Sequence, residues 1–308
     1  MNVVLDGRYK IIKKIGRGGF SHTYLARNLA LPEMPACVIK HLKPHLQHPR
    51  VLQLFEAEAR VLDRLDHQQI PNSTECFEKN GEVFMVQDFI DGNDLGKEYL
   101  RGRQWLESEM RDFLRDLLEI LQYVHQHHII HRDIKPDNII QRRDNGKFVL
   151  IDFGAVHELN ESAAEPSNST VVGTAGYRSP EQIRGEACFG IDIYGLGVTA
   201  IQLLTRTHPQ CLPTVDHKLV WRANTMISSE LADVIDRMVC PQVVDRYQSV
   251  VEVLADLAQL PAPETLANTY LEQENKPHDK SLFWKLKSWT NTVIKADAVG
   301  SRTPIKWF

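Results

Sequence analysis

The chain has 308 residues, a length typical of two domains or lobes, and it can bury a sizeable core without a disulfide or a structural metal. Apolar residues make up 43% and charged residues 25%, which excludes a disordered, collagen-like or coiled-coil chain. Lys and Arg number 36 and Asp and Glu 40, so the formal charge of −4 gives no global sign of nucleic-acid binding.

Cysteine usage and apolar patterning bear on location. The cysteines are odd in number, scattered and without a Cys-x-x-Cys pair, which favours free thiols in a reducing compartment. The first residues contain no apolar stretch of the kind found in secretory signals. The most apolar run, Ile193 to Leu204, is shorter than a membrane span. We therefore expect a soluble, cytoplasmic protein.

The first part of the chain is strand-rich. Tyr9–Ile15 is β-branched and precedes a glycine-rich turn, and Ala36–Lys40 is a second short apolar run. Residues 50–66 switch to helical spacing of apolar side chains. A further strand is predicted over Val83–Ile90, and Asp91–Asp94 is expected to form a turn.

Helical patterns dominate from residue 109. A long apolar stripe runs from Met110 to Val124. Strands followed by helices predict an α+β fold with two lobes, not an alternating β/α sheet. We expect a strand-rich portion over residues 1–90, a helix-rich portion over 91–260 and a separate tail over 261–308.

The tail differs from the rest of the chain in charge, with seven basic and five acidic residues. Leu282, Leu286, Trp289 and Val293 follow helical spacing. Three interpretations remain: a flexible tail with local helix, an interfacial helix over residues 276–308 on anionic lipid, or a segment that docks onto the chain or a partner. We favour the flexible tail, and the sequence does not indicate an oligomeric state.

The segment Gly16-Arg17-Gly18-Gly19-Phe20-Ser21 follows the first strand. Glycines allow the backbone to approach a triphosphate and to turn its N–H groups toward it. An isolated segment of this kind is more often a plain hairpin, so it acquires meaning only from other motifs.

Lys40 and Glu58 form a candidate ion pair. Glu58 lies four residues from Leu54 and from Leu62, on the apolar face of the predicted helix. An unpaired carboxylate on that face is costly, and Lys40 at the end of the second strand is the candidate partner. Such a pair would fix an ammonium group for contact with phosphate oxygens.

A third group of residues is typical of phosphoryl transfer. The segment from His131 to Asn138 reads H-R-D-I-K-P-D-N, and the Asp-Phe-Gly triplet at Asp152 begins nineteen residues after Asp133. Asp133 suits the carboxylate that orients an attacking hydroxyl, and Asn138 and Asp152 offer the hard oxygen ligands that Mg²⁺ prefers. The combination with a glycine-rich loop and a strand lysine is highly specific.

Over residues 7–258 the chain resembles the eukaryotic-like serine/threonine protein kinases of bacteria, most of all the cyanobacterial members. The resemblance implies a bilobal fold with a small β-rich N-lobe and a larger helical C-lobe. It also implies ATP and Mg²⁺ (or Mn²⁺) as cofactors, Ser/Thr hydroxyls of proteins as acceptors, and autophosphorylation. The enzyme would be a non-specific serine/threonine protein kinase, without a nucleic-acid partner.

The resemblance also implies a role for individual residues. Asp133 is the expected catalytic base, Lys135 steadies the γ-phosphate, Lys40 pairs with Glu58, and Asn138 and Asp152 hold the metal. The expected ATP contacts are Gly16, Arg17, Gly18, Gly19, Phe20, Ser21, Thr23, Val38, Lys40, Gln87 (the gatekeeper), Asp88, Ile90, Asp94 and Ile140. Three residues are expected to be structural: Glu181 paired with Arg246, and Asp192, which holds the backbone of the catalytic loop (131–138).

Several positions depart from the family pattern. Ser21 replaces the third loop glycine, Val38 and Thr23 change the adenine pocket, and Ser73 and Thr74 are polar where an apolar strand is usual. A nucleotide-binding pseudokinase scaffold would explain these changes together. The intact residues that bear on catalysis favour the enzyme instead. A small-molecule kinase is a weaker alternative, because Gly173–Glu181 matches the segment that builds a peptide platform.

Arg132 before Asp133 suggests control by phosphorylation, since in the family this arginine meets a phosphate on the activation segment. The candidate acceptors are Ser162, Ser167, Ser169 and Thr170. The alternative is that they are ordinary polar loop residues. We do not interpret His125, His127, His128 and His131 as a metal site: His131 is expected in the core and the others on the surface.

Overall fold

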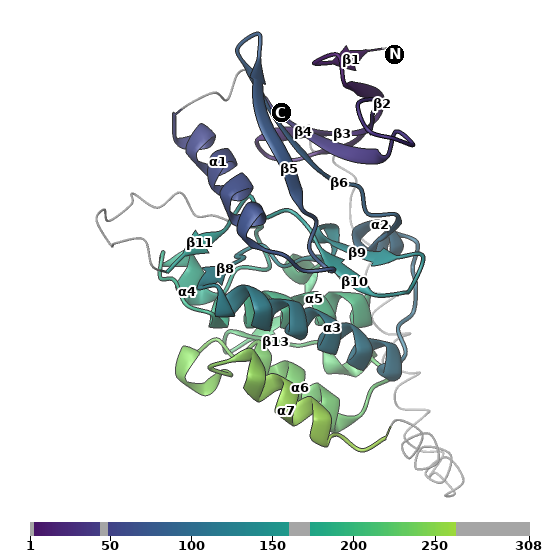
Figure 1. Ribbon diagram of the computed structural model, residues 1–308. Helices are drawn as coiled ribbons and strands as arrows, with labels where there is room; N and C mark the ends of the chain where they lie inside the picture. Colours follow the sequence, from purple (N-terminus) through teal and green to yellow (C-terminus); the bar gives the residue numbers. More distant parts are fainter. Residues whose placement is uncertain (1–2, 44–48, 160–172, 263–308) are drawn as a thin grey trace, which may run out of the picture. The chain divides into compact units, whose positions relative to one another are not determined.

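A computed structural model describes residues 3–43, 49–159 and 173–262. Up to Leu260 the chain forms one compact unit, with strands in its first part and helices in its second (Figure 1). This arrangement confirms the predicted α+β class. No helix in the described ranges is both long and apolar enough to cross a membrane.

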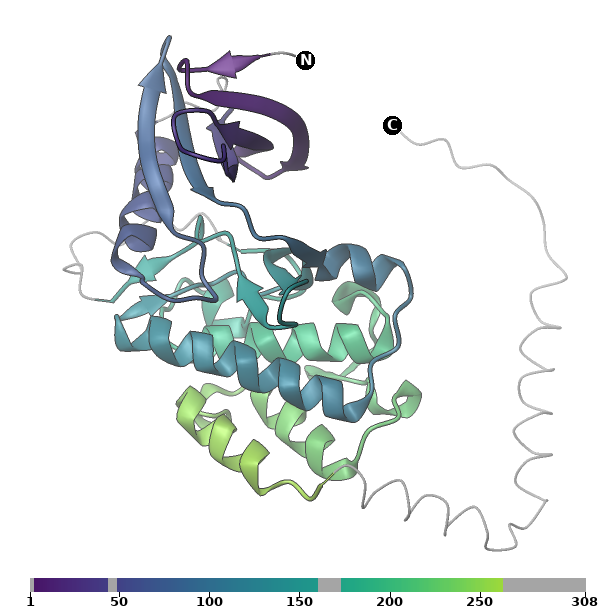
Figure 2. The same ribbon diagram turned by 45° about the vertical axis from the view of Figure 1, so that its right-hand side comes forward.

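Six strands form an antiparallel sheet in the order β1-β2-β3-β4-β6-β5. Its strands are β1 (Val4–Leu5), β2 (Tyr9–Arg17), β3 (Ser21–Asn28), β4 (Ala36–Leu42), β5 (Ser73–Lys79) and β6 (Glu82–Asp88). Helix α1 (Pro49–Arg64) lies beside this sheet in both views (Figures 1 and 2).

The remaining elements are mainly helical. The helices are α2 (Leu95–Leu100), α3 (Glu107–Gln126), α4 (Pro180–Ile183), α5 (Gly190–Thr205), α6 (Ser229–Met238) and α7 (Val250–Gln259). Short 3-10 helices are η2 (Pro136–Asn138), η3 (Pro209–Cys211), η4 (Arg222–Asn224) and η5 (Val243–Asp245). Short strands are β7 (Gly92–Asp94), β8 (Ile129–Ile130), β9 (Ile139–Arg142), β10 (Phe148–Leu150), β11 (His157–Glu158), β12 (Thr214–Val215) and β13 (Lys218–Leu219).

One prediction needs correction. Asp91–Asp94 was expected to form a turn, but Gly92–Asp94 is strand β7, which pairs antiparallel with β9. A Cβ at Gly92 would lie 2.3 Å from the Gln141 carbonyl oxygen, so the glycine serves a close backbone approach. The glycine that suggested a turn in the sequence is therefore needed for pairing with a distant strand.

The two faces of the six-stranded sheet face different cores, because side chains alternate along a strand. One face builds a small cluster with Ile39, Phe84 and Val86. The other face contributes Leu42 and Met85 to the main core, which continues through α1 into α3, α5, α6 and α7. The strand region and the helical region thus share one continuous apolar interior.

A buried ion pair connects α4 to the residue that follows η5. Glu181 of α4 and Arg246 after η5 are each 1% exposed, and Arg246 Nη2 lies 3.1 Å from Glu181 Oε2. Arg246 also donates to the carbonyls of Cys240 and Gly190, each at 2.9 Å. The structure therefore contains the pairing that the resemblance implied for these residues.

We expect Arg246→Met to lower the free energy of unfolding by about 3–5 kcal/mol, because it leaves the Glu181 carboxylate buried without its cation. Arg184→Met is the matched control: Arg184 pairs with Glu186, and their side chains are 55% and 58% exposed. Its cost should be much smaller, because water screens an exposed ion pair. Urea unfolding followed by circular dichroism measures both, and equal losses would contradict the assignment of a stabilising role to the buried pair.

Candidate active site

The first part of the site is an ammonium group shared by two carboxylates. Side chains alternate between the two faces of a strand. Ile39 is buried on one face of the sheet, so Val38, Lys40 and Gln87 lie on the opposite face, the one from which Lys40 reaches α1. There Lys40 Nζ bonds Glu58 Oε1 and lies 2.8 Å from Asp152 Oδ1. Lys40 is 8% exposed and Glu58 3%, so the pair predicted from the helical spacing forms inside the protein.

Burial alone would lower the pKa of Lys40, but the charges of Asp152 and Glu58 outweigh it and raise that pKa above its usual value. The Lys40 ammonium in turn holds the pKa of Asp152 at about 2. Burial, together with the nearby Asp152 charge, raises the pKa of Glu58 above its usual value even though Lys40 acts to lower it. Asp152 is therefore fully ionised at neutral pH, as a metal ligand must be.

The segment after Asp152 approaches α1 closely. A Cβ on Gly154 would lie 3.2 Å from both Glu58 Oε2 and Asp152 Oδ1, so glycine gives the two carboxylates room. Asp152 itself has a φ of +65°, a backbone conformation that non-glycine residues rarely adopt. Gln87 adds a longer contact, 3.4 Å from its Nε2 to Glu58 Oε1.

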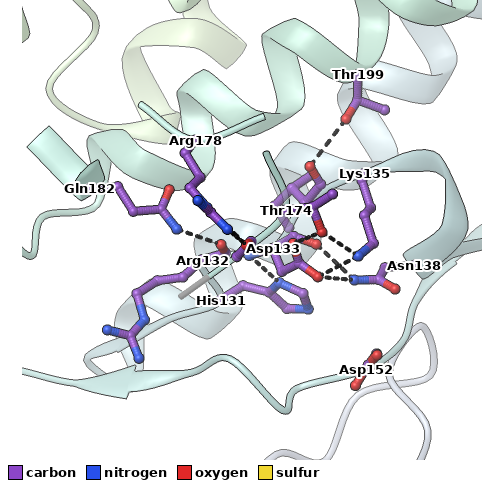
Figure 3. Close-up of polar contacts among 12 residues, drawn as sticks. His131, Arg132, Asp133, Lys135, Asn138, Asp152, Thr174, Arg178, Gln182 and Thr199 are labelled. Carbon is purple, nitrogen blue, oxygen red and sulfur yellow. Dashed lines mark hydrogen bonds and ion pairs between the residues drawn. The ribbon is translucent and has the colours of Figure 1, made fainter. Parts of the chain in front are cut away.

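The second part of the site surrounds Asp133 (Figure 3). Asp133 Oδ1 accepts from the Thr174 hydroxyl at 2.7 Å, and Oδ2 accepts from Lys135 Nζ at 2.7 Å. Asn138 Nδ2 donates to the Asp133 carbonyl at 2.8 Å and to its carboxylate at 3.1 Å. Lys135 Nζ also lies 2.5 Å from Thr174 Oγ1. These contacts fix the orientation of the carboxylate.

Asp192 of α5 holds the backbone of the catalytic loop in place. Its side chain is fully buried, and its two oxygens accept from the backbone N–H groups of His131 (2.9 Å) and Arg132 (2.8 Å). His125 Nε2 lies 2.9 Å from Asp192 Oδ2. Arg132 has a φ of +65°, so the carboxylate stabilises a strained backbone next to Asp133.

Gly173 lies near the end of the activation segment and contacts the catalytic loop. Its φ is +94°, and a Cβ there would lie 2.6 Å from the Arg132 carbonyl oxygen. Gln182 Nε2 donates to that same oxygen at 2.8 Å, and Arg178 Nε donates to the Gly173 carbonyl at 2.8 Å (Figure 3). Only a residue without a side chain allows the two segments to meet here.

The guanidinium of Arg132 donates hydrogen bonds to two backbone carbonyls. Its Nε donates to the Ala155 carbonyl at 2.6 Å and its Nη2 to the Val156 carbonyl at 2.9 Å. Arg132 thereby ties the catalytic loop to the segment after Asp152. The four candidate phosphorylation sites, Ser162, Ser167, Ser169 and Thr170, lie outside the described residues.

The expected nucleotide contacts come from several elements. Gly16 and Arg17 end β2, Gly18, Gly19 and Phe20 form the turn, and Ser21 begins β3. Strand pairing places Thr23 beside Lys40, on the face that carries Val38 and Gln87. This face is the one that turns toward Glu58.

The remaining expected contacts lie beyond β6. Asp88 ends β6, and its Oδ2 accepts from the Asn72 amide at 3.0 Å. Ile90 is 9% exposed. Asp94 pairs with Ile140 across β7 and β9 and caps α2, accepting from Lys97 N at 3.2 Å and Nζ at 2.8 Å. The Asp94 carboxylate thus has a structural role at the start of α2.

The donor set around Asp152 and Asn138 fits a hard divalent cation. The Asp152 side chain is 44% exposed, and the Asn138 amide nitrogen points at Asp133, which leaves its oxygen as the remaining acceptor. Across the described ranges, no three or more His, Cys, Asp or Glu side chains gather to hold a metal alone. One carboxylate and one amide match a Mg²⁺ or Mn²⁺ site that phosphate oxygens complete.

Comparison with known proteins decides the family. Residues 9–257 match the profile described as the protein kinase domain. The chain belongs to the protein kinase family. Among curated relatives, serine/threonine-protein kinase PknA of Nostoc sp. is 41% identical over 270 residues, which cover 83% of this chain and 48% of that protein. Serine/threonine-protein kinases B and C of Synechocystis sp. are 37% and 38% identical, over 84% and 80% of this chain and 48% of each relative.

These relatives are bacterial eukaryotic-like serine/threonine kinases, so the resemblance read from the motifs is confirmed. The kinase fold, with a curled N-terminal sheet and a helical region, is confirmed as well. The chain spans about half the length of the curated relatives it matches.

Sequence reasoning missed two residues of the site. His125 was expected on the surface, yet it is 8% exposed and lies against Asp192 and the ring of Phe189. Gln182 follows Glu181 and was not singled out, yet it reaches the catalytic loop. The signal for His125 is its place seven residues after Leu118, on the apolar stripe of α3.

We expect Asp192→Asn to lower the free energy of unfolding by about 2–4 kcal/mol, since an amide cannot accept from all the donors that face the carboxylate. Burial alone would raise the pKa of Asp192, but hydrogen bonds from His125 and the His131 backbone hold it below its usual value. A lowered pKa gives stability that is complete above the unfolded-state pKa, about 4, and is lost as the pH falls through the folded-state pKa.

The difference between wild type and Asp192→Asn should therefore be constant from about pH 5 to 7 and shrink below about pH 4. Urea unfolding at a series of pH values measures it. Asp144→Asn, at a carboxylate that is 64% exposed, is the control. A difference that grows as the pH falls would show that the carboxylate does not hold the loop in its ionised form.

Proposed function

We propose that this chain is a serine/threonine protein kinase that transfers the γ-phosphoryl group of Mg-ATP to Ser or Thr hydroxyls of proteins and autophosphorylates. One observation carries the proposal. The Asp133 carboxylate is oriented by Lys135, Thr174 and Asn138, while Lys40 is held in place by Glu58 and Asp152. Phosphoryl transfer depends on such positioning and on neutralisation of charge.

In this proposal Asp133 acts on the acceptor side. Its carboxylate accepts the proton of the incoming hydroxyl and aims the hydroxyl oxygen at phosphorus. Thr174 and Lys135 hold the carboxylate at 2.7 Å each, so little reorganisation is needed when the substrate arrives. Lys135 lies beside Asp133 and would steady the γ-phosphate.

On the nucleotide side, Lys40 supplies positive charge to phosphate oxygens while Glu58 keeps it in place. Asn138 and Asp152 would hold Mg²⁺ or Mn²⁺. When bound, the metal neutralises the developing charge on the phosphates. Thr23 and Val38 would line the adenine pocket, with Gln87 at its rear.

The same residues bear on substrate class. In the serine/threonine kinases that the chain resembles, a lysine two residues after the catalytic aspartate and a threonine in the activation segment distinguish serine/threonine from tyrosine specificity. Here Lys135 and Thr174 occupy these positions, and the Lys135 ammonium contacts the Thr174 hydroxyl. Gly173–Glu181 would present a protein segment at Asp133, because Gln182 and Arg178 fix this stretch against the catalytic loop. This geometry favours a protein substrate over a small molecule.

We infer a division into an N-lobe over residues 1–90, a C-lobe over 91–260 and a tail over 261–308, most of which lies outside the described residues. Five free cysteines fit a kinase that works in a reducing cytoplasm. A flexible tail remains our interpretation of 261–308, with lipid contact through 276–308 as its alternative.

The pseudokinase alternative rested partly on the polar start of β5. In the structure Thr74 Oγ1 donates to the Val86 carbonyl at 3.3 Å, which satisfies the hydroxyl within the sheet. Glu58 still reaches Lys40 from the neighbouring helix α1. The polar residues therefore leave the ion pair formed, which favours the enzyme.

The decisive measurement is intact mass after incubation with Mg-ATP, for wild type, Asp152→Asn and Asp133→Asn. We expect wild type to gain phosphate and both variants to do so at least about 100-fold more slowly, the scale of a lost proton acceptor or metal ligand. Asp144→Asn, an exposed carboxylate of the same region, is the control and should match wild type.

No phosphate on wild type, together with measured ADP binding, would contradict the proposal and support a nucleotide-binding scaffold. Mapping of the modified residues adds a second result. Phosphate on Ser162, Ser167, Ser169 or Thr170 would indicate control through the activation segment. Phosphate within 261–308 would make the tail the regulatory element.

A further inference from the structure

Lys43 lies just beyond β4 and is 7% exposed, although lysine rarely loses its contact with water. Its Nζ donates to two consecutive carbonyl oxygens of the glycine-rich turn, that of Gly18 at 2.8 Å and that of Gly19 at 2.7 Å. Its backbone N–H donates to the Phe20 carbonyl at 2.9 Å. One residue thus binds three successive carbonyls of the loop.

The turn closes on itself through one more bond. The Gly18 N–H donates to the Ser21 carbonyl at 3.0 Å. All four carbonyls from Gly18 to Ser21 are therefore accounted for by donors of the protein. Among the described residues, the N–H groups of Gly19 and Phe20 donate to no backbone carbonyl.

The orientation of those N–H groups follows from the peptide bond. A trans peptide is planar, with its C=O and N–H pointing in opposite directions. Because Lys43 draws the carbonyls of Gly18 and Gly19 to one point, the N–H groups of Gly19 and Phe20 must point away from it. Two neighbouring N–H groups on one side form a concavity suited to an anion.

The open space beside Gly19 supports the binding of a ligand against this turn. The φ of Gly19 is not in the left-handed region, and a Cβ on it would meet nothing within 4 Å. Neither backbone strain nor packing within the protein requires glycine at this position. A molecule that approaches the backbone closely would require it.

We propose that Lys43 is a positioning residue of the nucleotide site: it orients the peptide units of Gly18–Gly19 and Gly19–Phe20 so that their N–H groups face the nucleotide phosphates. This inference rests on the proposed kinase function and adds a residue to it. Lys43 also withdraws two carbonyl oxygens, which would otherwise repel phosphate oxygens, from the binding side of the loop.

The test compares wild type, Lys43→Met, Lys43→Arg and the control Lys10→Met, at an exposed lysine near the start of β2. Calorimetry gives the affinity for ADP and for adenosine. Losing two hydrogen bonds from a charged donor should weaken ADP binding about 10-fold. Adenosine binding should change less than about twofold, because it lacks the phosphates that the loop would hold. Lys43→Arg should recover most of the ADP affinity, and Lys10→Met should match wild type.

Hydrogen exchange in the nucleotide-free protein tests the loop directly. A peptide covering residues 15–22 should exchange faster in Lys43→Met than in wild type, because the turn loses its anchor. In kinetic assays the KM for ATP should rise about 10-fold while kcat changes less than about threefold. A merely structural role would shift the affinities for ADP and adenosine together.

Three results would overturn the proposal: unchanged exchange over residues 15–22, equal weakening of ADP and adenosine, or ADP affinity unaffected by Lys43→Met. Thermal unfolding identifies a variant that fails to fold, and Lys43→Arg then decides the question by retaining or losing ADP selectivity. Exchange and ADP binding require no phosphoryl transfer. If the wild type binds ADP but transfers no phosphate, the kinase function is refuted. The effect of Lys43→Met on ADP binding and on hydrogen exchange can still be interpreted.

Discussion

The Lys40 ammonium joins three parts of the chain that are far apart in the sequence. The lysine comes from strand β4, Glu58 from helix α1 and Asp152 from the segment after β10. A buried cation is costly unless it is paired, so the sheet, the helix and that segment are held together only when all three meet. The requirement is electrostatic: two carboxylates share one ammonium, and the Lys40 charge leaves Asp152 with a pKa of about 2.

A second constraint acts through backbone conformation. Arg132, which precedes Asp133, and Asp152, the proposed metal ligand, both have a φ of +65°. Such strain persists only where the surroundings impose it. Asp192 imposes it at Arg132 by accepting from the N–H groups of the catalytic loop, and Lys40 holds the Asp152 carboxylate. The buried charges therefore position the acidic groups of the site as well as the elements that carry them.

Local pattern predicted much of this arrangement. Helical spacing placed Glu58 on a buried face, and strand runs located β2, β4 and β6. The part that depends on long-range register was not predictable in this way. Gly92 pairs with a strand about fifty residues later, and His125 meets Asp192 across two helices. A glycine or a histidine in the sequence does not show which distant backbone it will approach, because that is set by packing of the whole core.

Lys43 illustrates the same limit at smaller scale. Antiparallel pairing of β3 with β4 sets Ser21 against Leu42, the last residue of β4, so Lys43 just beyond the strand lies beside the glycine-rich turn. Only that register brings its ammonium to the carbonyls of Gly18 and Gly19. The motif identifies the loop by its glycines, yet those glycines permit many orientations of the peptide units. A single buried lysine selects one of these orientations. A side chain outside the motif thus determines the direction in which the N–H and carbonyl groups of the loop point.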